Sequence, residues 1–215
     1  MSKILNITAE TALSATPVLP VVVIHDASAA EPLARALLAG GLGAVEITLR
    51  TEAALEAIRI VAKAVPEMLV GAGTVLSEAD LDAATEAGAR FALSPGATPK
   101  LLKAARDAAI PFIPGTATSS EVMRGLDLGY RCFKFFPAEQ LGGAAGVKAL
   151  AGPLPQARFC PTGGITAAQA PAYLALDNVL CVGGSWITPA EKINACDWDA
   201  ITALARRAIM LKPVA

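Results

Sequence analysis

Short apolar runs alternate with stretches of helical periodicity along almost the whole chain. The runs are rich in Val, Ile, Leu, Ala and Phe, which is typical of strands buried on both faces. Glycine, which commonly follows the last turn of a helix, precedes several of them. The pattern predicts eight strands, at residues 18–24, 44–49, 69–73, 91–94, 111–114, 132–136, 158–161 and 179–182.

Helices fit between these strands, and a further helical stretch, residues 4 to about 15, precedes the first one. Capping-box spacing, in which a Ser or Thr is followed three residues later by Glu or Gln, marks several helix starts. The pairs are Ser28 with Glu31, Thr118 with Glu121, and Thr166 with Gln169. Ser77 also suits a helix start, and Pro99 suits a first helical position.

Eight strand–helix units with short connections predict an α/β fold, a (β/α)₈ TIM barrel with an additional N-terminal helix. The alternative is an open doubly wound sheet, which would bind its ligand where the strand order reverses. We see no linker, low-complexity stretch or charge run, so residues 1–215 are expected to form a single barrel domain.

Composition and charge exclude several classes of protein. Apolar residues make up 54% of the chain and charged residues 17%, which argues against disorder. The formal net charge is −1 and no basic cluster is present, which argues against nucleic-acid binding. Neither a bilayer-spanning run nor a signal-peptide pattern is found, so we expect a cytoplasmic location with no membrane partner.

Cysteine and histidine are scarce. Of the four cysteines, Cys132, Cys160 and Cys181 fall in strand-like runs and are interpreted as small buried hydrophobic residues, while Cys196 lies outside them. The single histidine, His25, follows the first strand and is expected at the rim. A transition-metal site usually recruits several His or Cys ligands at close spacing, so no metal and no other cofactor is predicted.

Two charged residues stand out because they lie inside predicted strands. Strand alternation puts Glu46, Thr48 and Arg50 on one face and the apolar residues between them on the other. Lys134 lies between Phe133 and Phe135, whereas the other lysines fall in helical or terminal segments. Burial disfavours a charged ammonium, and a neutral amine is the form that attacks a ketone.

These residues also have purely structural interpretations. Glu46 and Arg50 could form a buried ion pair. Lys134 could extend its ammonium past the strand end into solvent.

The ends of the last two predicted strands carry glycine pairs. Gly163-Gly164 follows the seventh strand and Gly183-Gly184 follows the eighth. Unshielded backbone N–H groups and helix N-termini bind anions, and phosphate sites of TIM barrels lie in these two loops. Plain tight turns are the alternative. Thr74 and Pro95, at the ends of the third and fourth strands, are candidates for lining the same pocket.

Six segments in order closely resemble the bacterial 2-keto-3-deoxy-6-phosphogluconate (KDPG) aldolase family. They are EITLRT (46–51), GAGTVL (71–76), SPG (94–96), KFFPAE (134–139), FCPTGGI (159–165) and CVGGSW (181–186). The resemblance spans nearly the whole chain and implies Lys134 as the imine-forming lysine and Glu46 as the proton-transfer carboxylate. Arg50 and Thr74 would bind the keto-acid carboxylate, and Pro95 and Phe136 would form the pocket wall. The phosphate would be bound by Thr162, Gly163, Gly164, Gly184 and Ser185.

The resemblance implies a class I (Schiff-base) aldolase of the Entner–Doudoroff pathway that cleaves KDPG to pyruvate and D-glyceraldehyde 3-phosphate. It needs no cofactor, and family members are typically homotrimers. Cleavage of 4-hydroxy-2-oxoglutarate, or of the phosphogalactonate epimer, is a close alternative. A non-covalent phosphosugar isomerase and a non-catalytic phosphometabolite binder are more distant ones, and neither requires an amine nucleophile.

Overall fold

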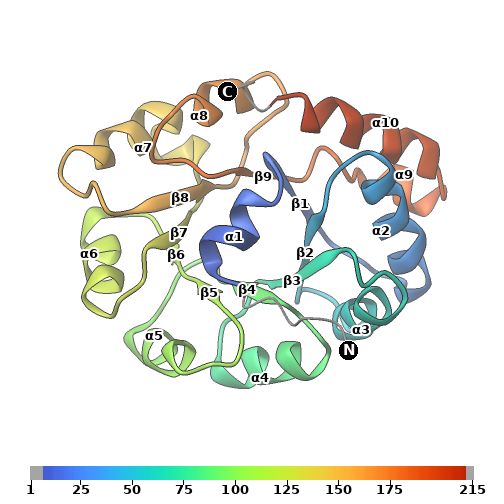
Figure 1. The fold of residues 1–215 in the computed structure, drawn as a ribbon, viewed down its shortest axis with the longest axis horizontal. Coiled ribbons are helices and arrows are strands. Elements are labelled where there is room, and N and C mark those ends of the chain that lie inside the picture. The colour runs from blue at the N-terminus through green and yellow to red at the C-terminus, as the bar shows by residue number, and fades with distance from the viewer. Residues whose placement is uncertain (1–6, 212–215) are drawn as a thin grey trace.

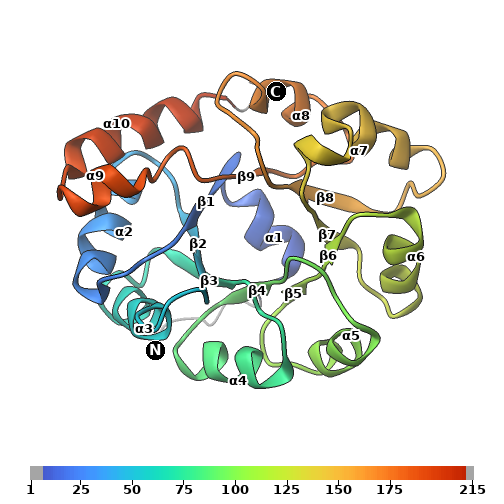
Figure 2. The same ribbon diagram turned by 180° about the vertical axis from the view of Figure 1, so that it is seen from behind.

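Strands gather at the centre of the molecule and helices surround them (Figures 1 and 2). The structure is a computed structural model that describes residues 7–211 of the chain. Parallel strands alternate with helices throughout, so the molecule has an α/β fold whose parallel sheet curls round a central axis. This curvature brings residues from strands that are distant in sequence to face one another inside the sheet.

Nine strands form two parallel sheets within the described residues. Their bounds are β1 (Val18–Val22), β2 (Ala44–Thr48), β3 (Leu69–Gly73), β4 (Phe91–Leu93), β5 (Phe112–Ile113), β6 (Gly115–Thr116), β7 (Cys132–Phe135), β8 (Arg158–Pro161) and β9 (Val182–Gly184). One sheet has the order β5-β4-β3-β2-β1-β9 and the other the order β6-β7-β8. Two isolated parallel bridges, Phe159 with Val179 and Thr162 with Gly183, connect the β8 edge to the chain leading into β9 and to β9 itself.

Most predicted strands are confirmed to within two residues, and two differ. The fifth, predicted at 111–114, is seen as β5, and Pro114, which has no N–H to donate, separates it from a further short strand, β6, beyond the predicted range. The eighth was predicted at 179–182, but β9 begins at Val182 and includes both glycines of its pair. Glycine is depleted in strands, so the pattern favoured a loop there.

The helices take two positions: the first lies across one end of the curled sheet, and the others lie on its outside (Figures 1 and 2). They are α1 (Ala9–Ser14), α2 (Ala30–Ala39), α3 (Ala54–Ala64), α4 (Glu78–Glu86), α5 (Pro99–Arg106), α6 (Ser119–Asp127), α7 (Gly143–Ala151), α8 (Ala170–Leu174), α9 (Ala190–Asn194) and α10 (Trp198–Ile209). Two short 3-10 helices, η1 (Ala27–Ala29) and η2 (Glu139–Leu141), precede α2 and α7. The N-terminal helix predicted at 4–15 is seen as α1; residues 4–6 of that prediction lie outside the described residues.

Helix starts agree in part with the predicted caps. Ser77 and Thr118 each form a capping box, and Pro99 occupies the first turn of α5. The prediction for Ser28 is wrong, because the Asp26 side chain accepts the Ser28 N–H and starts a 3-10 helix ahead of α2. Thr166 does contact Gln169, but α8 begins only at Ala170.

Alternation along the strands separates two apolar clusters. Val45 and Ile47 point outward into the large cluster between sheet and helices. A smaller cluster lies inside the curved sheet and includes Leu19, Phe91, Leu93, Ile113 and three cysteines. Helix α1 adds Ala12 and Leu13 to it and crosses one end of the curled sheet (Figures 1 and 2).

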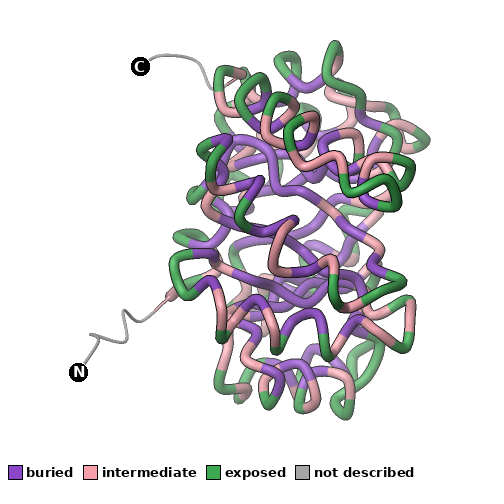
Figure 3. Tube along the Cα trace, turned by 90° about the vertical axis from the view of Figure 1, so that its right-hand side faces the viewer, coloured by how far each residue is buried: buried purple, intermediate pink, exposed green. Residues whose placement is uncertain are grey.

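Buried chain forms the middle of the molecule, and most exposed positions lie on the peripheral helices and loops (Figure 3). No helix within residues 7–211 is both long and apolar enough to cross a membrane.

Candidate active site

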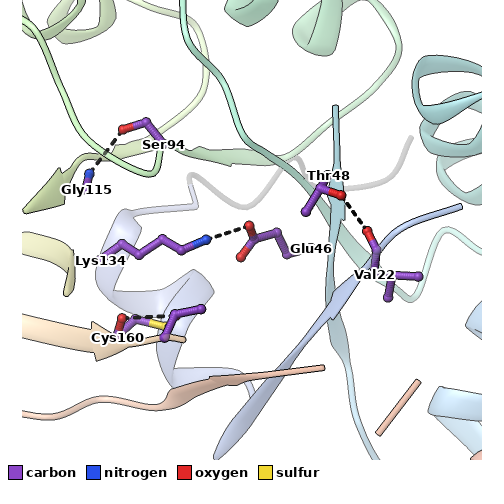
Figure 4. A network of polar contacts seen from close by, with 8 residues as sticks. Val22, Glu46, Thr48, Ser94, Gly115, Lys134 and Cys160 are labelled. Atoms are coloured by element: carbon purple, nitrogen blue, oxygen red, sulfur yellow. Dashed lines mark hydrogen bonds and ion pairs between the residues drawn. The ribbon is translucent and has the colours of Figure 1, made fainter. Parts of the chain in front are cut away.

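A buried ion pair lies inside the curved sheet. The Lys134 Nζ atom on β7 donates to the Glu46 Oε1 atom on β2 over 2.8 Å. The Lys134 side chain is 6% exposed and that of Glu46 is fully buried. Figure 4 shows the two side chains pointing toward one another from separate strands. Strand alternation inside a curved parallel sheet therefore brings together the two residues predicted to carry the chemistry.

Both structural alternatives for these residues are wrong. Glu46 pairs with Lys134, and Arg50 lies exposed two residues past the end of β2. Lys134 does not extend into solvent, since its ammonium is held at the Glu46 carboxylate. Thr48, on the Glu46 face, donates its hydroxyl to the Val22 carbonyl of the neighbouring strand at 2.9 Å.

The Glu46 carboxylate has one oxygen engaged and one free. Its Oε2 atom is buried and makes no hydrogen bond to the part of the chain that the structure describes. A buried polar atom without a partner is unfavourable, so sites of this kind are commonly functional. Oε2 is therefore the acceptor of this pair that has no protein partner within residues 7–211.

Phe136 connects the ion pair to a cavity. Its ring centroid lies 5.8 Å from Lys134 Nζ, within cation–π range. The same residue lines a cavity of about 170 Å³. The other lining residues are Val21, Val23, Arg50, Thr162, Gly163, Gly164, Ile165, Gly183 and Ser185. Six predicted binding residues thus lie round one hollow, which combines a guanidinium with exposed backbone.

The glycine loops form this hollow mainly through backbone. Gly163 and Gly164 have φ of 107° and 77°, a region that L side chains rarely adopt. A Cβ on Gly183 would lie 2.2 Å from the Thr162 hydroxyl oxygen, so only glycine fits between the loops. The expected help from helix N-termini is not seen directly at these pairs, because α8 and α9 begin several residues later.

Three predicted pocket residues are absent from the lining of this cavity. Thr74 follows β3 with φ of 60°, an uncommon value for a residue with a side chain. Pro95 lies after β4, where its backbone packs against Gly115. Gly184 is the last residue of β9, and a Cβ there would lie 2.3 Å from the Trp186 ring.

A family model described as KDPG and KHG aldolase matches residues 9–204. The chain belongs to the KDPG and KHG aldolase family. The KHG/KDPG aldolase of Escherichia coli K12 is 56% identical over 201 residues, which are 94% of this chain and 94% of that protein.

Solved structures of the KDPG aldolase family have the same fold. The Zymomonas mobilis enzyme superposes with a TM-score of 0.91 at 51% identity, covering 95% of this chain and 98% of that one. KDPG aldolase from Legionella pneumophila, with pyruvate captured at low pH as a covalent carbinolamine intermediate, has a TM-score of 0.91 and 48% identity. That comparison covers 93% of this chain and 97% of the Legionella chain.

Some residues of this aldolase-family site were not singled out by the sequence. A Cβ on Gly73 would lie 2.0 Å from Glu46 Oε1, so this glycine makes room for the carboxylate. Ser94 is fully buried and accepts the Gly115 N–H at 3.1 Å, which ties the end of β4 to the start of β6 (Figure 4). Gly73 belongs to one of the six segments that resemble the family. Its contact with Glu46 follows from the register between β2 and β3, which the sequence alone does not give.

The remaining candidates lie away from the ion pair or beneath it. Cys132, Cys160 and Cys181 are buried free thiols, as predicted, and belong to the inner apolar cluster. Cys196 is exposed. His25 is exposed just beyond β1, in agreement with a rim position.

Proposed function

We propose that this chain is a class I aldolase that cleaves KDPG to pyruvate and D-glyceraldehyde 3-phosphate, as in the Entner–Doudoroff pathway. The observation that carries the proposal is the buried 2.8 Å contact between Lys134 and Glu46. An amine nucleophile needs a neighbouring base to take its proton, and here the base is already in contact. The family's relatives named KDPG aldolase support the substrate.

Imine formation is the first step. Glu46 takes a proton from the Lys134 ammonium, and the neutral amine attacks the C2 carbonyl to give a carbinolamine. Glu46 then returns a proton to the C2 hydroxyl, which leaves as water and produces a protonated imine. Because one carboxylate oxygen has no protein partner, it can reach the substrate without breaking a competing hydrogen bond.

Carbon–carbon cleavage follows from the charge on this imine. Glu46, which is a carboxylate again after water has left, removes the proton of the C4 hydroxyl, the C3–C4 bond breaks, and D-glyceraldehyde 3-phosphate is released. The bonding electrons move toward the imine nitrogen and form an enamine. Protonation at C3 and hydrolysis then release pyruvate and regenerate Lys134. No step in this sequence uses a metal or an organic cofactor.

The substrate is held at both ends in this proposal. The cavity of Thr162, Gly163, Gly164 and Ser185 would take the phosphate, with Gly184 supporting the loop from the end of β9. Arg50 and Thr74 would bind the C1 carboxylate, and Pro95 and Phe136 would limit the pocket. Binding energy from the distant phosphate then holds C2 against Lys134.

Cleavage of 4-hydroxy-2-oxoglutarate to pyruvate and glyoxylate is a second candidate activity. The ion pair favours it, because the contact between Lys134 and Glu46 suits imine formation with any 2-keto acid. A shorter keto acid would use this pair and Arg50 and would leave the phosphate loops empty. The name of the Escherichia coli relative includes both activities.

A lactate-dehydrogenase-coupled assay tests the function. We expect pyruvate from KDPG at the highest kcat/KM, with less from 4-hydroxy-2-oxoglutarate and from the phosphogalactonate epimer. Borohydride added with pyruvate should reduce the imine to a secondary amine, which leaves the pyruvate carbons covalently attached to Lys134, as identified by peptide mass spectrometry. Isomerisation of a phosphosugar without any adduct, or binding without turnover, would replace this proposal by one of the two more distant alternatives.

We also propose that the two sheets close into a complete eight-unit (β/α)₈ barrel in a single domain with α1 as the additional helix. The bridges beside β8 and β9, and the direct run from β5 into β6, support closure. A homotrimer in the cytoplasm completes the proposal. Three buried thiols that remain free suit a reducing compartment. Light scattering coupled to size exclusion would measure the trimer.

A further inference from the structure

Glu139 lies behind the glycine loop and outside the proposed chemistry. It follows β7 by four residues and begins η2. Two backbone hydrogen bonds join this segment to the loop after β8: Ala138 N–H donates to the Thr162 carbonyl at 2.8 Å, and Glu139 N–H to the Gly163 carbonyl at 3.1 Å. The strand that carries Lys134 and the loop proposed to bind phosphate are thus directly connected.

The Glu139 side chain extends this connection to α8. Its Oε2 atom accepts from Gln169 Nε2 at 2.6 Å, and its Oε1 atom accepts from the Tyr173 hydroxyl. Gln169 uses its other amide atom to accept both the N–H and the hydroxyl of Thr166, at 2.9 and 2.7 Å. One carboxylate therefore holds Gln169, just before α8, and Tyr173, within α8, directly, and it holds Thr166, next to the glycine loop, through Gln169.

Glu139 also packs directly against the glycine loop. A Cβ on Gly164 would lie 3.0 Å from the Glu139 Cβ and 3.1 Å from its Cγ, so the side chain forms the back of this turn. Tyr173 is buried, and burial together with the Glu139 carboxylate raises the pKa of its hydroxyl well above the ordinary value. The tyrosine accordingly remains a hydrogen-bond donor at any physiological pH.

We propose that Glu139 is a positioning residue that sets the geometry of the 162–165 loop for the phosphate of the substrate, acting through Tyr173 and Gln169. The inference rests on the proposed function and adds a residue that touches no reacting atom. The Gln169 amide and the Tyr173 hydroxyl both donate to Glu139, and a carboxylate can accept at both of its oxygens. An amide in its place presents N–H groups to one of these donors, so one contact is lost.

The test compares substrates with and without phosphate. We expect Glu139→Gln to raise KM for KDPG about tenfold, a typical effect of losing one hydrogen bond to a charged group. It should leave kcat/KM for 4-hydroxy-2-oxoglutarate, and borohydride trapping of pyruvate, within about twofold of wild type. Inorganic phosphate should inhibit the variant about tenfold more weakly. Glu86→Gln, an exposed helical glutamate, is the matched control and should change none of these values.

A second variant separates positioning from folding. Tyr173→Phe keeps the buried ring and removes one donor, so it should raise the KM for KDPG in the same direction. The double variant should then lose less than the sum of the two single losses, because both changes act on the same hydrogen-bond network. Equal losses with both substrates, or an unchanged KM for KDPG in Glu139→Gln, would overturn the inference. Failure of pyruvate trapping in the wild-type enzyme would instead reject the proposed aldolase chemistry.

Discussion

Two single residues carry the proposed chemistry: within residues 7–211 the buried charged side chains are Lys134 and Glu46, and they form one ion pair. Isolated, either the Lys134 ammonium or the Glu46 carboxylate would be strongly disfavoured by burial. Together they satisfy one another over 2.8 Å, while Glu46 Oε2 remains free. A buried ion pair contributes little to stability, because burial of both charges costs free energy. It suits proton transfer, because the proton passes directly from Nζ to Oε1 over 2.8 Å.

Glu46→Gln separates proton transfer from packing. The amide fills the same volume and can still accept a hydrogen bond from Lys134, but it cannot take a proton. We expect turnover of KDPG to fall about 10²–10⁴-fold, the usual contribution of general acid–base catalysis. Stopped-flow trapping of the pyruvate imine should slow as well, and circular dichroism should show an intact fold. More than half of the wild-type turnover would exclude Glu46 as the proton carrier.

At the scale of elements, the register of β3 against β2 leaves space for the Glu46 carboxylate beside Lys134. Glu46 pairs with Gly71 and Thr48 with Gly73, so Gly73 faces the Glu46 carboxylate obliquely from the next strand. We expect Gly73→Ala to lower kcat about a hundredfold, because its methyl group would lie 2.0 Å from Glu46 Oε1 and force the carboxylate away from Lys134. Steady-state assays of purified variants measure this effect.

Gly43→Ala is the control for that substitution. Gly43 precedes β2, and a Cβ there would meet nothing within 4 Å. The control should keep activity within about twofold of wild type, as expected for an unstrained surface change. If the two variants behave alike, the carboxylate does not depend on the space left by Gly73.

Patterning predicted the elements better than it predicted their ends. Alternation along β2 places Glu46 inward correctly, because the period of a strand is fixed by its geometry. Arg50 follows the same alternation but lies past the end of β2, where the rule no longer applies. The strand β9 was displaced in the prediction because Gly183 and Gly184 are selected for space against Thr162 and Trp186, which no local propensity records. The role of Glu139 could not be predicted either, because its partners Gln169 and Tyr173 lie 30 or more residues away in the sequence.

On the scale of the whole molecule, the two ends of the curved sheet differ in chemistry. At one end α1 lies over the inner apolar cluster, and its Leu13 packs with Leu19, Phe91 and the buried thiols. The opposite end carries the polar loops and the glycine cavity. The ion pair therefore lies between the inner apolar cluster and the polar loops, and both of its side chains are buried. Because the end at α1 is apolar, deprotonation of a buried thiol there should lower the stability of the folded protein.

Alkaline pH deprotonates thiols, and Cys132 lies in the inner apolar cluster. Burial, more than the nearby Glu10 carboxylate, raises the pKa of Cys132 from 9.0 to about 11. Between these values the unfolded chain releases the thiol proton while the folded chain retains it. The unfolded state then binds fewer protons, so the free energy of unfolding falls as pH rises from 9 to 11. The loss from Cys132 alone is at most about 2–3 kcal/mol, from 1.36 kcal/mol for each pKa unit.

Tyr130 extends the decline, since burial raises its pKa from 10.0 to about 12. Urea unfolding followed at pH 8, 9.5 and 10.5 should show this fall. Cys132→Ala should have a shallower pH dependence, and it should not become flat, because Cys181 also has a raised pKa in the same cluster. Exposed Cys196→Ala should reproduce the wild-type slope. Equal slopes of unfolding free energy against pH for all three proteins would mean that Cys132 is reached by water before the chain unfolds. That result would contradict the placement of α1 over the inner apolar cluster.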